Sequence, residues 1–209
     1  MRNRAASKIN TTRFMDKLYK THFLSQLKTR MSLDRPEFQL RKVPRDHAHR
    51  WLFTNSVLYV HSLPSGRCVW LDWTPGDGVE REFFAHLGWT FTSDSLPVNQ
   101  PGDKRIHFIR EPSAELACGT INIQAVEGRN AIAGFKIATP WDELYALSPR
   151  TPEAERKIVM DRAYSKYLAL SEADRIDATR LALNDAFTCL SSVLPRFESA
   201  LERLPCIDV

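Results

Sequence analysis

The sequence lacks long hydrophobic runs, closely spaced cysteines and glycine-rich phosphate loops. No stretch approaches the roughly 18 to 20 apolar residues that a membrane-spanning helix requires, so we expect no transmembrane segment. The basic N-terminus is not followed by the apolar core of a secretory signal, which argues against secretion. Neither G-x-x-x-x-G-K nor G-x-G-x-x-G occurs, so nucleotide binding through either of these loops is excluded.

The cysteines and histidines form no recognisable metal or disulfide pattern. His47 and His49 would point to one side of an extended strand, as a metal pair needs, but no third ligand lies at a recognisable spacing. We therefore predict no metal site and no cofactor. The absence of any C-x-x-C pair indicates a reducing compartment, so we predict a cytoplasmic protein with mostly buried thiols. The four widely spaced cysteines are Cys68, Cys118, Cys189 and Cys206.

The composition that is present is typical of a folded domain, but the charge is unevenly placed. The 209 residues are 43% hydrophobic and 26% charged, which suits one large domain or one domain with an appendage. Residues 1–45 hold 12 Lys and Arg against three acidic residues, whereas the remainder holds 17 against 22. Such a distribution suggests contact with nucleic acid, an anionic membrane or an acidic partner. The alternative is that the basic segment folds onto its own acidic body.

The basic segment contains a predicted helix from Thr12 to about Leu33. Four of its basic residues fall within an arc of about 80° on a helical wheel, opposite an aromatic-rich side. Pro36 and Pro44 then mark a connector that extends the basic region. We predict that this region contacts nucleic acid or an acidic partner, and the alternative is a solvated face over an ordinary core contact. The predicted contact residues are Arg13, Lys17, Lys20, Lys28, Arg41, Lys42 and Arg45.

The clearest structural signal is the stretch Val57–Trp73. Two runs of β-branched and aromatic residues flank the turn residues Pro64-Ser65-Gly66-Arg67, a pattern that predicts a β-hairpin with glycine in its turn. A two-residue loop would place His61 opposite Trp70. A turn that is one residue longer would shift this register along the whole hairpin.

In the two-residue register, one face of the hairpin is wholly apolar. The other carries apolar side chains together with side chains that end in polar atoms. Tyr59, His61 and Trp70 form the predicted partner-binding face. Cys68, together with His61 and Asp72, is the nearest approach to a Cys-His-Asp catalytic set, with Cys68 and His61 about 5–8 Å apart. The alternative is that a helix covers this face and that its polar tips are hydrogen-bonded.

The residues after the hairpin predict a helix and then further strands. Asp77 precedes Glu80 by three positions, the reciprocal pattern of a helix start, and Gly88 is a usual helix end. We therefore predict a helix over Val79–Leu87. Short strands are expected at Trp89–Phe91 and Arg105–Arg110, and a second hairpin is expected from Gly119–Val126 with Ala131–Ala138.

From Thr139 onwards the pattern becomes helical. Thr-Pro pairs at Thr139 and Thr151, and a capping pattern at Ser171, predict three helix starts. The third helix carries Leu and Phe at the three-to-four spacing of a buried stripe. Pro195 is expected to end that helix and to allow a new short one through Leu204. These helices could cover the sheet or hold a partner.

Together the segments predict an α+β fold. It comprises an antiparallel sheet of about five strands built from two hairpins, an N-terminal basic helix and a C-terminal helical layer. We predict one compact domain with three parts. These are a basic helix and connector over 1–45, a mainly β core with one helix over 46–139, and a helical layer packed on that core over 140–209.

No catalytic signature stands out, since the chain has no G-x-S-x-G elbow and its acidic residues near the hairpin fall on different elements. We therefore predict a non-catalytic intracellular interaction protein, a subunit or adaptor of a larger complex. It would bind another protein and, through its basic region, nucleic acid or an acidic partner. Two alternatives are an enzyme of unrecognised type that uses His61, Cys68 and Asp72, and a stand-alone protein that binds DNA or RNA.

Overall fold

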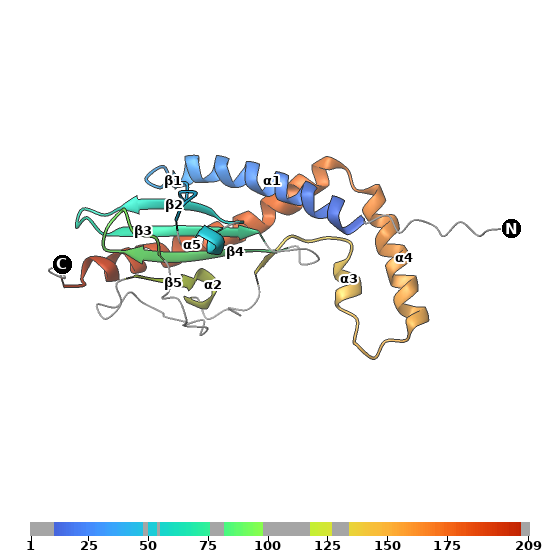
Figure 1. Ribbon diagram of the computed structural model, residues 1–209. Coiled ribbons are helices and arrows are strands. Elements are labelled where there is room, and N and C mark those ends of the chain that lie inside the picture. Colours follow the sequence, from blue (N-terminus) through green and yellow to red (C-terminus); the bar gives the residue numbers. More distant parts are fainter. Residues whose placement is uncertain are drawn as a thin grey trace.

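The computed structural model describes residues 11–47, 50–53, 55–75, 82–97, 118–126 and 134–205. These residues form an α+β fold, as predicted. Figure 1 shows an elongated molecule with the sheet at one end and two helices, α3 (Asp142–Tyr145) and α4 (Glu153–Ala169), at the other. Among the described helices, none combines the length and the apolar character that crossing a membrane requires.

The sheet is antiparallel, and its main path follows the chain from β1 to β5. A sixth strand also pairs with β4, through Glu82 and Phe83, beyond the part of β4 that pairs with β5. A 3-10 turn, Arg50–Phe53, precedes the second strand. The strands are β1 (Gln39–Arg41), β2 (Val57–Ser62), β3 (Cys68–Pro75), β4 (Glu82–Thr90), β5 (Cys118–Asn122) and β6 (Phe135–Lys136).

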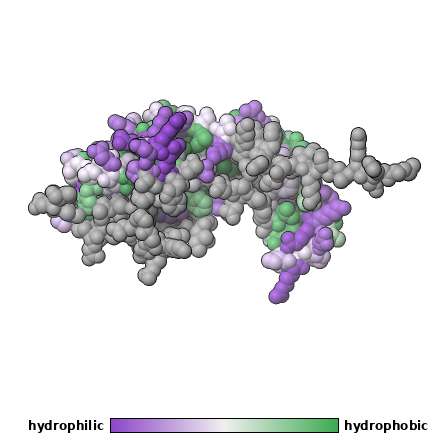
Figure 2. Space-filling view, viewed as in Figure 1, coloured by the Kyte–Doolittle hydropathy of each residue, from purple (hydrophilic) through white to green (hydrophobic). Residues whose placement is uncertain are grey.

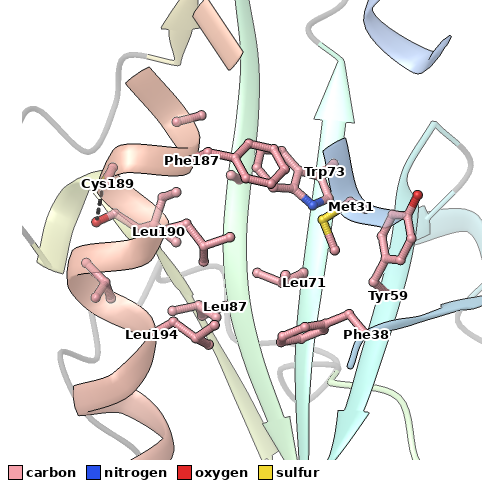
Figure 3. Close-up of a cluster of buried hydrophobic side chains, with 14 of the residues drawn as sticks. Met31, Phe38, Tyr59, Leu71, Trp73, Leu87, Phe187, Cys189, Leu190 and Leu194 are labelled. Carbon is pink, nitrogen blue, oxygen red and sulfur yellow. Dashed lines mark hydrogen bonds between the residues drawn. The ribbon is translucent and has the colours of Figure 1, made fainter. Parts of the chain in front are cut away.

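The hydrophobic core lies between the sheet and two long helices, α1 (Thr11–Asp34) and α5 (Glu172–Glu202). Figure 3 shows Phe187 and Leu194 of α5 directed toward Trp73 and Leu87 of the strands, with Met31 of α1 in the same layer. The rings of Trp73 and Phe187 are stacked, with centroids 5.4 Å apart. Alternate strand residues meet the apolar stripes of both helices, so one face of the sheet is covered.

Phe83 is the point at which four elements meet in this core. Its ring centroid lies 4.6 Å from that of Phe23 on α1, 5.5 Å from that of Phe135 on β6 and 6.1 Å from that of Trp73 on β3. Offset and tilted aromatic pairs at such distances contribute about 0.5–1.5 kcal/mol each beyond the burial of their area. Phe83 therefore fixes α1 and β6 relative to the centre of the sheet.

The predicted hairpin is present, but the predicted register is wrong by one residue. His61 pairs with Val69, and the N–H of Leu63 donates to the carbonyl of Arg67 at 2.7 Å. The loop therefore has three residues, and Gly66 takes a φ of 82°, the left-handed conformation that closes such loops. Because side chains alternate along a strand, a shift of one residue changes which side chains share a face.

The predicted helix over Val79–Leu87 is wrong, because its described residues, 82–87, lie in strand β4. Residues 79–81 lie outside the described residues. Gly88 lies inside the strand opposite Trp70 and ends no helix. The predicted short strand after it is the end of β4, and the predicted capping residues Asp77 and Glu80 lie outside the described residues. The strand alternates, since its odd-numbered residues are buried beneath the helices: Phe83, Ala85, Leu87 and Trp89.

The second hairpin does not form as predicted. The chain leaves β5 at Asn122 and enters a single helical turn, α2 (Ile123–Val126). Phe135–Lys136 returns to the sheet but pairs with β4 and not with β5. The strand predicted at Arg105–Arg110 lies outside the described residues.

The predicted start of α5 is confirmed, whereas the predicted cap of α4 is off by one residue. Pro152 and not Thr151 occupies the cap position of α4, and no side chain caps it. At α5, Ser171 and Asp174 form a capping box in which the Ser171 hydroxyl accepts from the backbone N–H of Asp174 at 3.1 Å. The predicted break at Pro195 is wrong, because α5 continues to Glu202. Pro195 and Ser191, whose carbonyl loses its usual donor, are both exposed, so water can replace the missing hydrogen bond.

Candidate functional site

A row of polar side chains crosses the face of the sheet that points away from α1 and α5. Asp72 on β3 and Asn122 on β5 lie directly opposite His86 on β4, one on each side. The Thr74 hydroxyl donates to Asp72 Oδ1 at 3.0 Å and lies 2.9 Å from Ser56 Oγ. The row forms because even-numbered residues of β3 and β4 point to this face.

Burial shifts the two titratable groups of this row in opposite directions. Desolvation raises the pKa of Asp72, an effect reduced by the attraction of His86 and by hydrogen bonds from Ser56 and Thr74. Desolvation lowers the pKa of His86, and the attraction of Asp72 partly offsets this. Burial thus favours the neutral form of each group, and the two titrate as a coupled pair.

The structure does not bring together the Cys-His-Asp set considered from the sequence. His61 points toward the helices, because it pairs with Val69, whereas Cys68 and Asp72 point to the opposite face. Cys68 and Asp72 are four residues apart on one strand, which separates them by about 13 Å. His86, the histidine that does lie beside Asp72, is at the level of Asp72 and not of Cys68. Nucleophile and base would have to be within hydrogen-bond reach.

The predicted partner-binding face is likewise divided between the two sides of the sheet. Tyr59 is buried in the helix-covered core, and the ring of His61 lies 5.4 Å from that of Phe38 on that side. Trp70 is buried on the other side, where its indole N–H donates to the Thr90 hydroxyl at 2.8 Å. Tyr59, His61 and Trp70 therefore form no common surface.

The described residues contain no group of three or more His, Cys, Asp or Glu side chains placed to hold a metal ion. His47 is half-buried, and its predicted companion His49 lies outside the described residues. The two cysteines whose side chains are described, Cys68 and Cys189, are buried, and the Cys189 thiol donates to the Ile123 carbonyl at 3.5 Å.

The predicted basic contact residues are exposed wherever the structure describes their side chains. Lys20 and Lys28 are exposed on α1, and the three others follow on β1 and the turn after it. Within the described part of the chain, none of these five is seen to form an ion pair or side-chain hydrogen bond. Figure 2 shows strongly hydrophilic surface over β1 and the adjoining end of α1. The three others are Arg41, Lys42 and Arg45; the side chains of Arg13 and Lys17 lie outside the described part.

The exposed apolar side chains gather at the other end of the molecule. Of the eight large hydrophobic side chains that are exposed among the described residues, six lie on α4 or the first third of α5. Figure 2 shows hydrophobic surface beside hydrophilic surface at this end. Scattered exposed leucines are ordinary, but a concentration on one element marks a candidate contact. The six are Ile158, Met160, Tyr164, Leu168, Ile176 and Leu181.

Two parallel apolar stripes explain this exposure on α4. Val159, Ala163 and Tyr167 recur every four residues and are buried. The second stripe lies one position further along the helix at each turn, and 44%, 39% and 64% of its three residues are exposed. Residues four apart share a helix face, so the two stripes are adjacent. We call the second one the open stripe; it consists of Met160, Tyr164 and Leu168.

The short helix α3 and the residue before it cover the first stripe but leave the second open. The ring of Trp141 lies 6.1 Å from that of Tyr167 and 6.4 Å from that of Tyr164, at the boundary between the stripes. On the far side of α3, Glu143 pairs with Arg162 at 2.9 Å and with Lys166. These contacts hold α3 against the buried stripe and beside Tyr164 at the centre of the open stripe. Met160 and Leu168 remain exposed on an arm that the sheet does not reach.

Comparison with known proteins returns no match, whether with family models, with curated proteins or with solved structures.

Sequence reasoning missed two of these features, although both left a signal. Phe83, Ala85 and Leu87 recur at every second position in the sequence, which is the period of a strand. The pairing of this strand with β3 then places His86 beside Asp72. The spacing of the open stripe is visible in the sequence as well. Nothing in the sequence distinguishes which of the two stripes on α4 is covered, because both are apolar.

Proposed function

We propose that the protein is a non-catalytic interaction protein, a subunit or adaptor of a larger cytoplasmic complex. In this proposal the arm formed by α3 and α4 binds another protein through the open stripe. The observation that carries the proposal is the exposure of Met160, Tyr164 and Leu168 on a helix whose neighbouring stripe is buried. Exposed apolar side chains that recur along one helix face are typical of protein contacts.

The shape of the open stripe suits a helix of the partner. Its three residues span eight positions, a length of about 12 Å along the helix axis. Side chains spaced by four residues form a ridge that packs into the groove of a second helix. The aromatic Tyr164 at the centre adds a type of side chain that is enriched in interfaces.

A second contact, with an anionic partner, is supported by the exposed basic residues at the opposite end. Arg41, Lys42 and Arg45 are solvent-exposed and are seen to pair with no described side chain. Nucleic acid and an acidic protein are both compatible with this charge. The basic residues lie on the sheet end, so the two contacts would use separate surfaces.

The test of the arm is the native mass of the tagged protein in its own cells. The wild type should run in a complex heavier than a single chain. The double variant Met160→Ser/Leu168→Ser should run as the free chain, because the apolar ridge is removed from an exposed position. The matched variant Lys157→Ser/Asp161→Ser changes polar residues of the same helix and should keep the complex. Loss in the control, or retention in the stripe variant, would contradict the proposal.

A further inference from the structure

Strand β1 is one border of the sheet, since it pairs with β2 on one side only. All three of its residues, Gln39–Arg41, are exposed, and Leu40 is 50% exposed. Outside the pairing with β2, the described residues make no backbone hydrogen bond to β1. Residues of an antiparallel pair alternate between facing the partner and facing away, so β1 presents main-chain donors and acceptors on its outer side.

Three cations flank this open edge. Arg41 is the last residue of β1, and Lys42 and Arg45 follow in the connecting segment. All three side chains are exposed, and the segment 39–47 contains a single carboxylate, that of Asp46. A strand added to this edge would therefore meet positive charge at the end where β1 leads into the connecting segment. Opposite charges facing each other across strands contribute roughly 0.2–1 kcal/mol per pair.

Charged residues on an edge strand can have two effects. They can prevent pairing with other chains, which is how many proteins protect their edges. They can also select an edge partner of the opposite charge. The exposed Leu40 favours the second effect, the binding of an oppositely charged partner. Preventing edge pairing does not require an apolar side chain on the edge, whereas an added strand would cover Leu40. Leu40 and the open backbone also favour a polypeptide over nucleic acid, whose phosphates would use neither.

The register of β1 specifies the pattern of such a partner. Leu40 pairs with Tyr59, so it lies on the helix-covered side of the sheet. Gln39 and Arg41 pair with Val60 and Leu58 and lie on the other side. An added strand should then alternate, with apolar residues on the side of Leu40 and acidic residues on the side of Arg41.

We propose that β1 binds an extended acidic segment of a partner protein as an additional strand. The main chain of the segment pairs with Gln39–Arg41, its carboxylates face Arg41, Lys42 and Arg45, and an apolar side chain covers Leu40. This inference rests on the proposed interaction function and names the partner class of the basic residues.

The experiment is a selection of random peptides of about ten residues, a usual upper strand length, on the full-length chain. Enriched peptides should be acidic, should alternate with apolar residues, and should lose binding when alternate backbone amides are N-methylated. Binding to the double variant Arg41→Glu/Lys42→Glu should weaken by about tenfold or more. The matched variant Arg150→Glu/Lys157→Glu makes the same charge change at exposed positions far from β1 and should bind as the wild type does. Circular dichroism confirms that each variant is folded.

Each contrary outcome overturns the inference. Enrichment of no peptide, or only of peptides that tolerate N-methylation, would exclude strand addition at this edge. Equal weakening in both charge variants would show a diffuse attraction without a site on β1. If duplex DNA or RNA displaces the bound peptide more strongly than unlabelled acidic peptide does, the basic residues bind nucleic acid and the inference is wrong. The variant Leu168→Ser should leave peptide binding unchanged, so failure of the arm contact is distinguishable from failure of the edge contact.

Discussion

The guanidinium of Arg67 donates a 2.8 Å hydrogen bond to the carbonyl oxygen of Leu201, which lies 134 positions away in the sequence. The same side chain also donates to the carbonyls of Glu202 at 2.9 Å, Pro205 at 3.0 Å and Leu204. The last carbonyls of a helix have no donors of their own, and the helix dipole places negative charge there. Arg67, in the hairpin turn, therefore supplies the C-terminal cap of α5.

We predict that Arg67→Met lowers the free energy of unfolding by about 3 kcal/mol, because charged hydrogen bonds to four carbonyls are lost together. Urea unfolding measures the change. Arg203→Met is the matched control, since Arg203 is exposed on the same helix end and donates only to Ser199 Oγ. The control should change stability by less than about 0.5 kcal/mol. Equal effects of the two variants would show that Arg67 is not the cap.

His86 should make the stability of the fold depend on pH. Burial lowers the pKa of His86 in the folded state below its unfolded value of about 6.5. As the pH falls, the unfolded chain therefore takes up the proton first, and the free energy of unfolding decreases below about pH 6.5. Between about pH 7.5 and 5.5 the wild type should therefore lose stability relative to His86→Gln. Urea unfolding at both pH values measures this difference.

The contribution of Asp72 to the pH dependence has the opposite sign. Its pKa is raised by burial, so the folded state takes up that proton first as the pH falls toward its unfolded value of about 3.8. Repeating the comparison in an Asp72→Asn background removes this contribution and should leave the effect of His86 in place. A wild type that gains stability relative to His86→Gln on acidification would show that attraction by Asp72 outweighs burial.

Gly66 provides a test of the observed hairpin register. Its φ of 82° is costly for a residue with a side chain, so Gly66→Ala should destabilise the protein by about 1 kcal/mol. Gly66→Asn should cost less, because asparagine enters the left-handed region more readily. No atom outside its chain neighbours lies within 4 Å of the added Cβ, so a clash would not explain the loss. Equal stability of all three proteins would contradict the three-residue loop.

The open stripe should be dispensable for folding. Leu168→Ser replaces a side chain that is 64% exposed, so it should change the free energy of unfolding by less than about 0.5 kcal/mol. Thermal unfolding measures the change. Val159→Ser is the matched substitution on the buried stripe of the same helix and should cost about 2 kcal/mol. Similar losses from both substitutions would show that the open stripe is part of the core and not a contact surface.

The hairpin and the long helices could be predicted because their signals are local. Alternation around a glycine turn predicted β2 and β3, and the capping pattern at Ser171 predicted the start of α5. The register was missed because two- and three-residue loops both fit Pro64–Arg67. The local pattern at Pro195 predicts a helix end, but the residue lies on the solvent side of α5. The buried face of that helix packs in the core and keeps the helix continuous, which a local rule does not take into account.

The strand β4 and the candidate surfaces depend on contacts between distant segments. The local pattern of Asp77, Glu80 and Gly88 is typical of the two ends of a helix. Strand β4 forms instead, because its residues pair with β3 and its apolar side is buried under α1 and α5. Similarly, the exposure of Leu168 depends on where α3 lies against α4. The row of Asp72 and His86 requires the β3–β4 register. Periodicity alone therefore indicates a strand at β4 but fixes neither its pairing partner nor the exposure of Leu168.

The measurement that tests the central claim most directly is photo-crosslinking in the native cells from a reactive residue placed at Leu168. The control position is Leu33, which is 72% exposed on α1 and lies outside the arm. The account predicts a discrete adduct with a different protein from Leu168, and none of that mass from Leu33. Absence of an adduct from Leu168, an adduct between two copies of this chain, or the same adducts from both positions would contradict it.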